Sequence, residues 1–394
     1  MTRRLPATAR ISLLCASIGR QVDGVRDYSE QLMAALLGSG VETQLLEYRS
    51  GRWTRRTATG SVEEIGAEEA VASFRASCWV IVQYSPFAFG PGGFAPWLLR
   101  LLARTAAGPR VAVMIHEAYV DWGTGRQRVM SAWQRLQLRR IVASADLVLT
   151  STDAWSRAVA RWVTRPPMHL GVGSNLPDMR PTRGHARAGL GVHDGQVVLG
   201  SLSTGHDSGL PGYVSAAVAE AARQQRDIVH LNLGATAPAT AGSARTVRPG
   251  WLTRESLAEM VSAADLFLAP FKDGASTRRT SVMAALQHGV PVVSTDGPHT
   301  DRVFTKPGSG VVLAPVGRSS DFAEIVAKLA GGECWRIELG SAARRCYERD
   351  FAWPVIAGRL LAELARLERP PPSTSRTTPA TTLDGERTAP DAAV

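Results

Sequence analysis

The pattern of hydrophobic and polar residues predicts alternating strands and helices over most of the chain. The apolar runs are continuous rather than alternating, which indicates strands buried on both faces of a parallel sheet. In the first half, the expected strands are residues 10–17, 41–48, 78–85, 110–117 and 145–152, and the expected helices are residues 24–40, 62–76, 94–106 and 125–143. This order is typical of a doubly wound sheet with helices on both sides.

The alternation stops at residues 165–195, which are rich in Pro and Gly and predict a linker. It then restarts, with expected strands at 196–203, 228–235, 265–271, 290–295 and 310–315, and expected helices at 211–225, 254–263, 319–330 and 351–370. We therefore expect two Rossmann-like domains, at residues 1–175 and 176–350, followed by a helix at 351–369. The tail, residues 370–394, has no aromatic residue and is rich in Pro, Ser and Thr, so we expect it to be disordered.

The composition is that of a soluble globular protein, with 44% hydrophobic and 20% charged residues. Four scattered cysteines without a C-x-x-C pair indicate reduced thiols and a cytoplasmic location. The sequence has no run of 18 apolar residues, so we expect no membrane-spanning helix. The amino-terminal sequence imitates a signal peptide, but its apolar part, residues 11–16, is short, and we interpret it as a buried strand.

The net charge is +10, and all but three of the 45 basic residues are arginine. Residues 96–165 hold eleven arginines against four acidic residues, which favours a surface for anionic ligands, although a solvated arginine-rich face is equally open. The expected helix at 126–142 combines Trp133, Leu136 and Leu138 with five arginines. Peripheral contact with an anionic membrane, at the inner face, and a plain surface helix are both compatible with this segment.

Arg278 and Arg279 stand where a small-sided apolar helix is expected to open, in the stretch DGASTRRTSVMAALQHGVPVVST (273–295). A helix N-terminus carries a partial positive charge and unpaired N–H groups, so acidic residues are usual there. The stretch follows an expected strand, at the edge where ligands of such sheets bind. We therefore expect the two guanidiniums to bind a diphosphate. In the alternative, both side chains extend to solvent and pair with carboxylates.

We expect the loop before Arg278 to contribute to the same diphosphate site. We expect Gly274 to let the backbone approach a ligand closely and Ser276 or Thr277 to cap the helix.

The stretch ADLFLAPFKDGASTRRTSVMAALQHGVPVVSTD (264–296) resembles the donor-site signature of retaining glycosyltransferases of family four, a GT-B group. Residues 284–293, AALQHGVPVV, match the family's EAM-x-x-G-x-PVV ending. Residues 23–42 and 351–361 resemble two further segments of the family. The resemblance implies an α/β GT-B fold, in which two Rossmann-like doubly wound domains face each other across a cleft. It also implies a hexosyltransferase-like enzyme with a nucleotide sugar in the second domain and an acceptor on the first.

The resemblance also implies site residues. It places His116 as a catalytic residue, although a structural histidine is equally open, and Gly24 and Val25 as donor-binding residues. From the residues themselves we add Arg278 and Arg279 as catalytic residues, and Asp273, Gly274, Ala275, Ser276, Thr277 and His206 as donor-binding residues. The chain departs from the family pattern, because the two usual glutamates fall near Thr277 and on Ala284, with only Asp273 nearby. The usual Arg and Lys after the first strand of the second domain are also missing. Our hypothesis is that Arg278 and Arg279 replace them, in a subgroup with a GAS-x-RR loop.

Bond cleavage in a nucleotide sugar develops negative charge on the departing phosphate, which cations must stabilise. The chain has no Asp-x-Asp motif, so we predict no metal and no cofactor beyond the nucleotide-sugar co-substrate. Retention by same-face attack is expected, and inversion with Asp23 as base is the alternative.

The acceptor is expected to be a polysaccharide or other carbohydrate, a glycolipid or other lipid-linked molecule, or a small natural product. Phe87, Phe89, Tyr119 and Trp122 lie on glycine-rich stretches and suit stacking on such an acceptor, whereas ordinary loop packing is equally open. A GT-B protein that binds a nucleotide sugar but has lost activity or needs a partner is a second function class. The third function class is a different doubly wound protein, such as an epimerase or a nucleic-acid-binding module. The sequence contains no recognition module for nucleic acid, so we expect no nucleic-acid partner. No G-x-G-x-x-G follows residues 10–17, which argues against a dehydrogenase.

Overall fold

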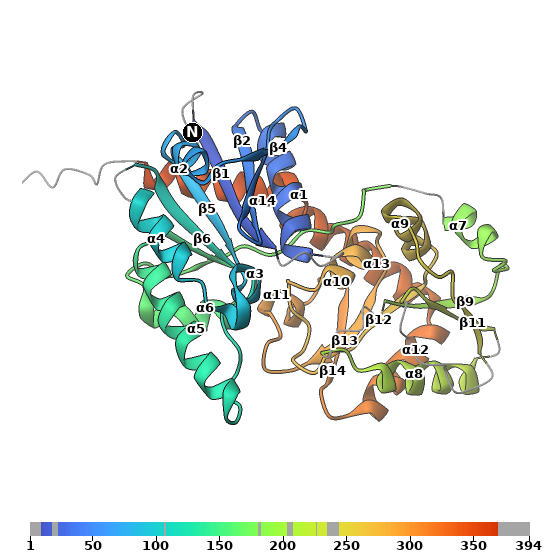
Figure 1. The fold of residues 1–394 in the computed structure, drawn as a ribbon. Helices are drawn as coiled ribbons and strands as arrows, with labels where there is room; N and C mark the ends of the chain where they lie inside the picture. The colour runs from blue at the N-terminus through green and yellow to red at the C-terminus, as the bar shows by residue number, and fades with distance from the viewer. Residues whose placement is uncertain are drawn as a thin grey trace, which may run out of the picture.

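The computed structural model describes residues 9–17, 23–105, 108–179, 183–202, 208–225, 227–234 and 244–368. These residues form two lobes, each built around one sheet with helices on both faces (Figure 1). The first sheet has eight strands and the second has six. The α/β class expected from the apolar runs is therefore the class observed.

The first sheet has the order β4-β3-β2-β1-β5-β6-β7-β8. Its strands are β1 (Arg10–Ser17), β2 (Glu42–Arg49), β3 (Arg52–Arg56), β4 (Val62–Ile65), β5 (Trp79–Tyr84), β6 (Arg110–Ile115), β7 (Leu147–Thr150) and β8 (Met168–His169). Neighbours from β2 to β8 pair in parallel, whereas β3 and β4 add an antiparallel edge. The expected helix over 62–76 was wrong for residues 62–65, which form the edge strand. Only Ile65 of β4 is buried, so this strand lacks the long apolar run that marks the central ones.

The helices of the first lobe cover both faces of this sheet. They are α1 (Gly24–Gly38), α2 (Ala67–Arg75), α3 (Pro86–Phe89), α4 (Pro96–Thr105), α5 (Arg126–Ala143) and α6 (Asp153–Val159), with 3-10 turns η1 (Pro91–Gly93) and η2 (Ala160–Trp162). Leu13 and Leu14, neighbours in β1, belong to separate apolar clusters on opposite faces, and both are fully buried. This burial on both sides explains the continuous apolar runs.

The second sheet is parallel throughout, with the order β11-β10-β9-β12-β13-β14. Its strands are β9 (Val197–Ser201), β10 (Ile228–Asn232), β11 (Arg245–Val247), β12 (Leu266–Ala269), β13 (Val292–Asp296) and β14 (Val311–Pro315). Its helices are α7 (Arg183–Gly189), α8 (Pro211–Gln224), α9 (Arg254–Ser262), α10 (Thr280–Gln287), α11 (Arg302–Thr305), α12 (Ser319–Gly331) and α13 (Glu333–Asp350). The predicted linker at 165–195 contains β8 and α7, so it is not wholly irregular.

The sequence did not predict α13, and its packing explains why. A Cβ on Gly340 would lie 2.5 Å from the carbonyl oxygen of Gly289, and the Cβ of Ala343 is 2.4 Å from the place of a Cβ on Gly310. The buried side of α13 is made largely of small residues because the chain passes so close to it. Small residues give a weak hydrophobic period, so the helical signal is lost.

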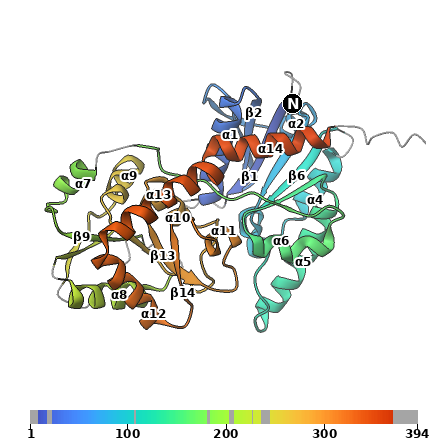
Figure 2. The same cartoon turned by 180° about the vertical axis from the view of Figure 1, so that it is seen from behind.

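The last helix, α14 (Trp353–Leu367), leaves the second lobe and crosses the back of the first (Figure 2). Ile356 and Leu360 of α14 pack into the same apolar cluster as Ile11 of β1. The indole N–H of Trp79 donates to Glu368 over 2.8 Å, which fixes the end of this crossing. The tail from residue 369 lies outside the described residues. Within the described chain, no helix is long and apolar enough to span a membrane.

Candidate functional site

The strand order of the second sheet creates a switch point between β9 and β12, because the chain adds β10 on one side of β9 and β12 on the other. In open parallel sheets, ligands bind beyond the carboxyl ends of the strands at such a point. The loops after β9 and β12 meet there, since the Lys272 N–H donates to the Ser208 carbonyl over 2.8 Å. Arg279 joins the two loops as well, because its Nη1 donates to Ser208 Oγ over 2.8 Å. The segment that contains Arg278 and Arg279 therefore lies at this switch point, beyond the carboxyl ends of β9 and β12.

The two arginines lie before α10 rather than in its first turn. The helix begins at Thr280, and Arg279 is the N-cap residue with an extended backbone. Ser276 and Thr277 therefore do not cap α10, and no side chain supplies a cap hydrogen bond to this helix. Because α10 begins directly after the two arginines, its first N–H groups and both guanidiniums lie at the same end of the helix, where an anion can contact both.

Both arginine side chains are turned into the protein. The side chain of Arg279 is 10% exposed and that of Arg278 is 20% exposed, so neither extends to solvent. Asp273 binds both, with its Oδ2 3.1 Å from Arg278 Nη2 and its Oδ1 in contact with Arg279 Nη2. The guanidinium of Arg279 also lies 4.2 Å above the ring of Phe271. The cluster is thus a preformed pair of cations held by one carboxylate.

The surroundings keep Asp273 ionised. Burial raises the pKa of Asp273, but the hydrogen bond from His299 and the charges of Arg279 and Arg278 outweigh it, so the pKa lies well below its ordinary value. Burial, followed by repulsion from Arg278, lowers the pKa of Arg279. Asp273 therefore acts as the fixed counter-charge that orients both guanidinium groups.

A second carboxylate reaches the cluster from the other lobe. Glu117 follows β6, and its Oε1 lies 3.2 Å from Arg278 Nη1. Ser85, at the end of β5, donates to the other oxygen of Glu117 over 3.3 Å. The sequence analysis missed Glu117, although a carboxylate directly after His116 at the end of an expected strand was a signal for it. Two guanidiniums and two carboxylates therefore meet here, and their formal charges cancel.

His116 is buried, and its ring Nε2 lies 2.9 Å from Gln83 Oε1. Its ring also meets the ring of Tyr28 edge-on, with centroids 4.7 Å apart. Burial lowers the pKa of His116 to about 3, so the imidazole is neutral at neutral pH. His116 can therefore act at the end of β6 as a neutral hydrogen-bonding group and not as a cation.

The segment around Gly24 and Val25, two of the expected donor-binding residues, is described only in part. Gly24 begins α1, and the Asp23 carboxylate caps this helix by accepting from the N–H groups of Val25 and Arg26 over 3.1 and 3.2 Å. The N–H of Val25 is thus already paired with its own chain. Residues 18–22 and residues 203–207, which include His206, lie outside the described residues.

The loop of Gly274 to Ser276 is shaped by its own chain. Gly274 has φ of +93°, and a Cβ there would lie 2.2 Å from Thr300 Oγ1, so the close approach expected for a ligand is made to residues 297–300. Ala275 is buried, and its N–H donates to the Thr295 carbonyl over 2.9 Å. Ser276 is also buried, with no partner for its hydroxyl. Residues 274–276 are therefore a buried part of the loop that precedes the arginines.

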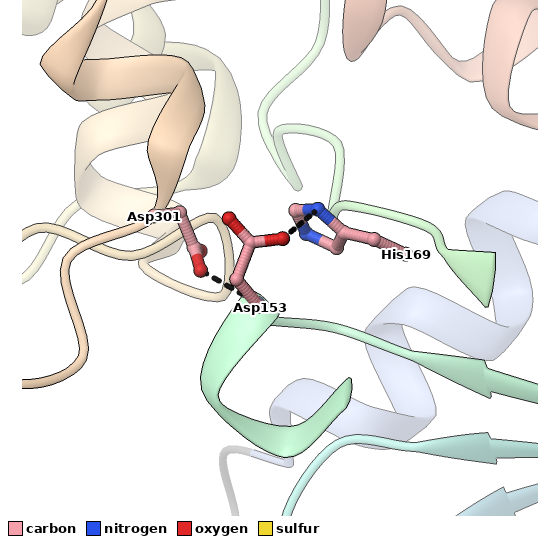
Figure 3. A group of neighbouring side chains, drawn as sticks. All are labelled: Asp153, His169 and Asp301. Carbon is pink, nitrogen blue, oxygen red and sulfur yellow. Dashed lines mark hydrogen bonds and ion pairs between the residues drawn. The ribbon is translucent and has the colours of Figure 1, made fainter. Parts of the chain in front are cut away.

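Asp153, His169 and Asp301 lie together where the two lobes meet (Figure 3). Thr277 joins this cluster through its hydroxyl group. Thr277 Oγ1 lies 2.8 Å from both Asp301 Oδ2 and His169 Nε2, and the Asp301 Oδ1 accepts the Asp153 N–H over 2.7 Å. Asp153 in turn contacts His169 Nδ1 at 3.1 Å and accepts the N–H of Arg302, at the start of α11 (Figure 1), over 2.8 Å. The three titratable groups are close enough to hold a metal ion. However, every carboxylate oxygen already has a partner in the protein, so the arrangement fits a clasp between the lobes rather than a metal site.

The expected acceptor residues separate into two groups. Phe87 and Phe89 line a pocket of about 510 Å³ at the carboxyl end of the first sheet. Tyr119 and Trp122 instead hold Arg135, whose guanidinium carbon lies 3.5 Å and 4.8 Å from their ring centres. The first pair therefore borders this pocket, and the second pair packs against Arg135.

Comparison with known proteins gives a family match within the second lobe. Residues 197–331, which contain the arginine segment, match the family described as glycosyl transferases group 1. No curated protein matches this sequence significantly.

Solved structures share the fold over nearly the whole chain. Sucrose-phosphate synthase from Thermosynechococcus elongatus superposes with a TM-score of 0.66 at 17% identity, covering 91% of this chain and 98% of that one. HepE from Anabaena, in complex with UDP-glucose, gives 0.59 at 14% identity, covering 91% and 99%. WaaG, a glycosyltransferase of lipopolysaccharide biosynthesis, gives 0.57 at 14% identity, covering 90% and 99%. The expected GT-B fold, with two Rossmann-like lobes, is thereby confirmed.

Proposed function

We propose that this chain is a glycosyltransferase that moves a sugar from a nucleoside-diphosphate sugar to an acceptor bound on the first lobe. The observation that carries the proposal is the pair Arg278 and Arg279 at the switch point of the second sheet, inside the segment that matches the glycosyl transferases group 1 family. UDP-glucose bound to HepE, which shares the fold, supports the same class of donor. The protein is further proposed to be cytoplasmic.

The two guanidiniums would stabilise the departing diphosphate. Charge-assisted hydrogen bonds from planar guanidiniums match phosphate oxygens, and the first N–H groups of α10 add to them. Asp273 is a positioning residue in this mechanism, since it fixes the orientation of both side chains. Because the site is already balanced in charge, Glu117 must release Arg278 when the diphosphate binds.

The reaction is proposed to proceed with retention and without a metal. Two cations and a helix N-terminus supply the charge that a metal would supply to the leaving group. The carboxylate of Asp23, the candidate base for inversion, is bound to two N–H groups of α1 and serves as its cap. His116 would lie near the transferred sugar as a neutral hydrogen-bonding group.

A thermal-shift screen with UDP, GDP, dTDP and their sugars tests donor binding. A ligand at a hundred times its dissociation constant stabilises the folded protein by about 2.7 kcal/mol. A transfer and hydrolysis assay with the donor that binds then distinguishes an enzyme from the second candidate, an inactive nucleotide-sugar-binding protein. Binding with no turnover would favour that candidate, and no binding by any nucleotide would contradict both.

We also propose that α5 makes peripheral contact with an anionic membrane. The chain has no acidic residue between Asp121 and Asp146, whereas α5 carries five arginines. Val129 and Leu136 of this helix are exposed beside them. Co-sedimentation with vesicles of anionic phospholipid, absent with neutral vesicles, tests this contact.

A further inference from the structure

A second switch point lies in the first sheet, between β1 and β5. The pocket of about 510 Å³ is found there, since it is bordered by Ser17, the last residue of β1, and by the segment after β5 that contains α3 and η1. We propose that this pocket holds the acceptor by an uncharged, apolar ring system, so that the acceptor is a hydroxylated aglycone and not a free carbohydrate or an anionic lipid. This inference rests on the proposed transfer reaction.

Aromatic side chains line the pocket, and none of its lining residues in the described part of the chain is charged; residues 18–22, which follow Ser17, lie outside that part. The aromatic lining is Tyr48, Phe87, Phe89, Phe94 and Trp97, and none of the other lining residues is Asp, Glu, Lys, Arg or His. An anionic group placed here would lose its water without gaining a cation, which is costly. A free carbohydrate would need several convergent polar groups, whereas the pocket offers mainly ring faces.

The pocket is held rigid by hydrogen bonds and ring contacts. Phe89 is buried and stacks between Tyr84 and Trp97, with centroid distances of 5.8 and 5.7 Å, and the indole N–H of Trp97 donates to the Phe89 carbonyl over 2.9 Å. The glycine turn beside it is fixed by α5, because Gln134 Nε2 donates to the Gly92 carbonyl over 2.8 Å. A preformed apolar cavity binds a rigid ring with little loss of conformational freedom.

The rim of the pocket remains open. Phe87 is 37% exposed and Phe94 is 51% exposed, so two ring faces are available to a ligand. Phe94 is held in place by Trp133, with ring centroids 4.5 Å apart. Aromatic side chains of this kind gain most by stacking on another apolar ring.

One segment of the chain contributes both to the pocket and to the proposed reaction centre. Ser85 directly precedes α3, whose Phe87 and Phe89 line the pocket, and its hydroxyl donates to Glu117 over 3.3 Å. Glu117 contacts Arg278 at 3.2 Å. A ring seated in the pocket can therefore direct a hydroxyl group along this edge toward the sugar on the donor.

Equilibrium dialysis with three probes tests the inference. The probes are 2-naphthol, 6-hydroxynaphthalene-2-sulfonate, which adds an anionic charge to the same rings, and maltotriose. We expect 2-naphthol to bind at least tenfold more tightly than either of the others. Equal or tighter binding of the sulfonate or of maltotriose, or no binding of 2-naphthol up to millimolar concentration, would overturn the proposal.

Two variants locate the binding. Phe87→Glu and Phe94→Glu should each weaken 2-naphthol binding at least tenfold, whereas Trp251→Ala, which removes an exposed aromatic side chain on the second lobe, should leave it unchanged. Two rim variants are used so that a folding defect in one does not decide the result. Unchanged binding in a folded rim variant contradicts the assignment of the pocket.

UDP binding by the same variants separates this inference from the proposed function. The rim variants should bind UDP as the unchanged protein does. If no nucleotide binds but 2-naphthol does, the proposed function fails and the pocket is not an acceptor site. If a nucleotide binds but 2-naphthol does not, only the present inference fails.

Discussion

The guanidinium of Arg278 in the second lobe lies 3.2 Å from the carboxylate of Glu117 in the first lobe. The same arginine is bound to Asp273 on its own loop. Its two carboxylate partners therefore lie in different lobes, because Asp273 is in the same loop as Arg278 and Glu117 is in the facing lobe. If a diphosphate binds Arg278, it must compete with Glu117.

The competition predicts that Glu117→Gln tightens UDP binding. A partly exposed ion pair contributes up to about 1 kcal/mol, so the dissociation constant should fall by roughly two- to fivefold. Asp27→Asn is the matched control, because Asp27 forms another ion pair between the lobes, with Arg254 at 2.6 Å. Calorimetric titration measures both variants. Equal tightening by Asp27→Asn would show that looser lobes, and not release of Arg278, cause the effect.

Asp273→Asn is predicted to reduce both stability and UDP binding. It leaves the buried guanidinium of Arg279 without its counter-charge, which costs about 1–3 kcal/mol in the free energy of unfolding. Urea denaturation measures this loss. A second substitution, Arg279→Met, removes the unpaired charge and should recover part of the stability of Asp273→Asn but none of its UDP binding. A stable Asp273→Asn variant with normal UDP affinity would contradict the positioning role.

The burial of His116 predicts a dependence of stability on pH. The pKa of His116 is lowered to about 3 in the folded protein, whereas an unfolded histidine titrates near pH 6.5. As pH falls from 6.5 toward 3, only the unfolded chain gains this proton, so the folded state loses about 1.4 kcal/mol per pH unit from this group. His116→Gln should remove that loss, and urea denaturation between pH 7.5 and 5 measures it.

His230 provides a comparison for that experiment. Burial lowers its pKa to about 4, so His230→Gln should also reduce the loss of stability in acid. If the stability of the His116→Gln variant falls with pH as steeply as that of the unchanged protein, His116 is not held neutral in the folded state.

The clasp of Asp153, His169 and Asp301 is predicted not to bind metal. Since its carboxylate oxygens are already hydrogen-bonded, Mn²⁺ or Zn²⁺ would have to break contacts between the lobes. We expect neither ion to raise the melting temperature and EDTA to leave it unchanged. Asp301→Asn should lower the free energy of unfolding by about 1–3 kcal/mol, because its amide places a donor against backbone N–H groups. Stabilisation by either ion, lost in Asp301→Asn, would contradict the clasp.

The sequence predicted those strands and helices that are marked by an apolar run or a family pattern within a short stretch of the chain. The strand at Arg10–Ser17 has apolar residues on both faces, and the segment 284–293 carries a specific family pattern. The edge strand Val62–Ile65 and the helix α13 were missed because one is mostly exposed and the other packs through small residues.

The site was predicted less completely than the fold. Arg278 and Arg279 were recognised because two adjacent cations at an expected helix start are unusual. Their pairing with carboxylates was foreseen only as the alternative and without naming the partners, since the contact with Glu117 joins residues 161 positions apart. Such a contact depends on how two lobes face each other, and no periodicity along the chain records it.

The most direct test of the account is a calorimetric titration of UDP into the double variant Arg278→Ala/Arg279→Ala. Removing two charge-assisted interactions with the diphosphate should cost about 3–6 kcal/mol, which is a loss of affinity of more than about a hundredfold. Arg223→Ala, which removes an exposed arginine paired with Glu220, should leave the affinity unchanged. If the folded double variant binds UDP as tightly as the unchanged protein, the two arginines do not hold the diphosphate and the proposed donor site is wrong.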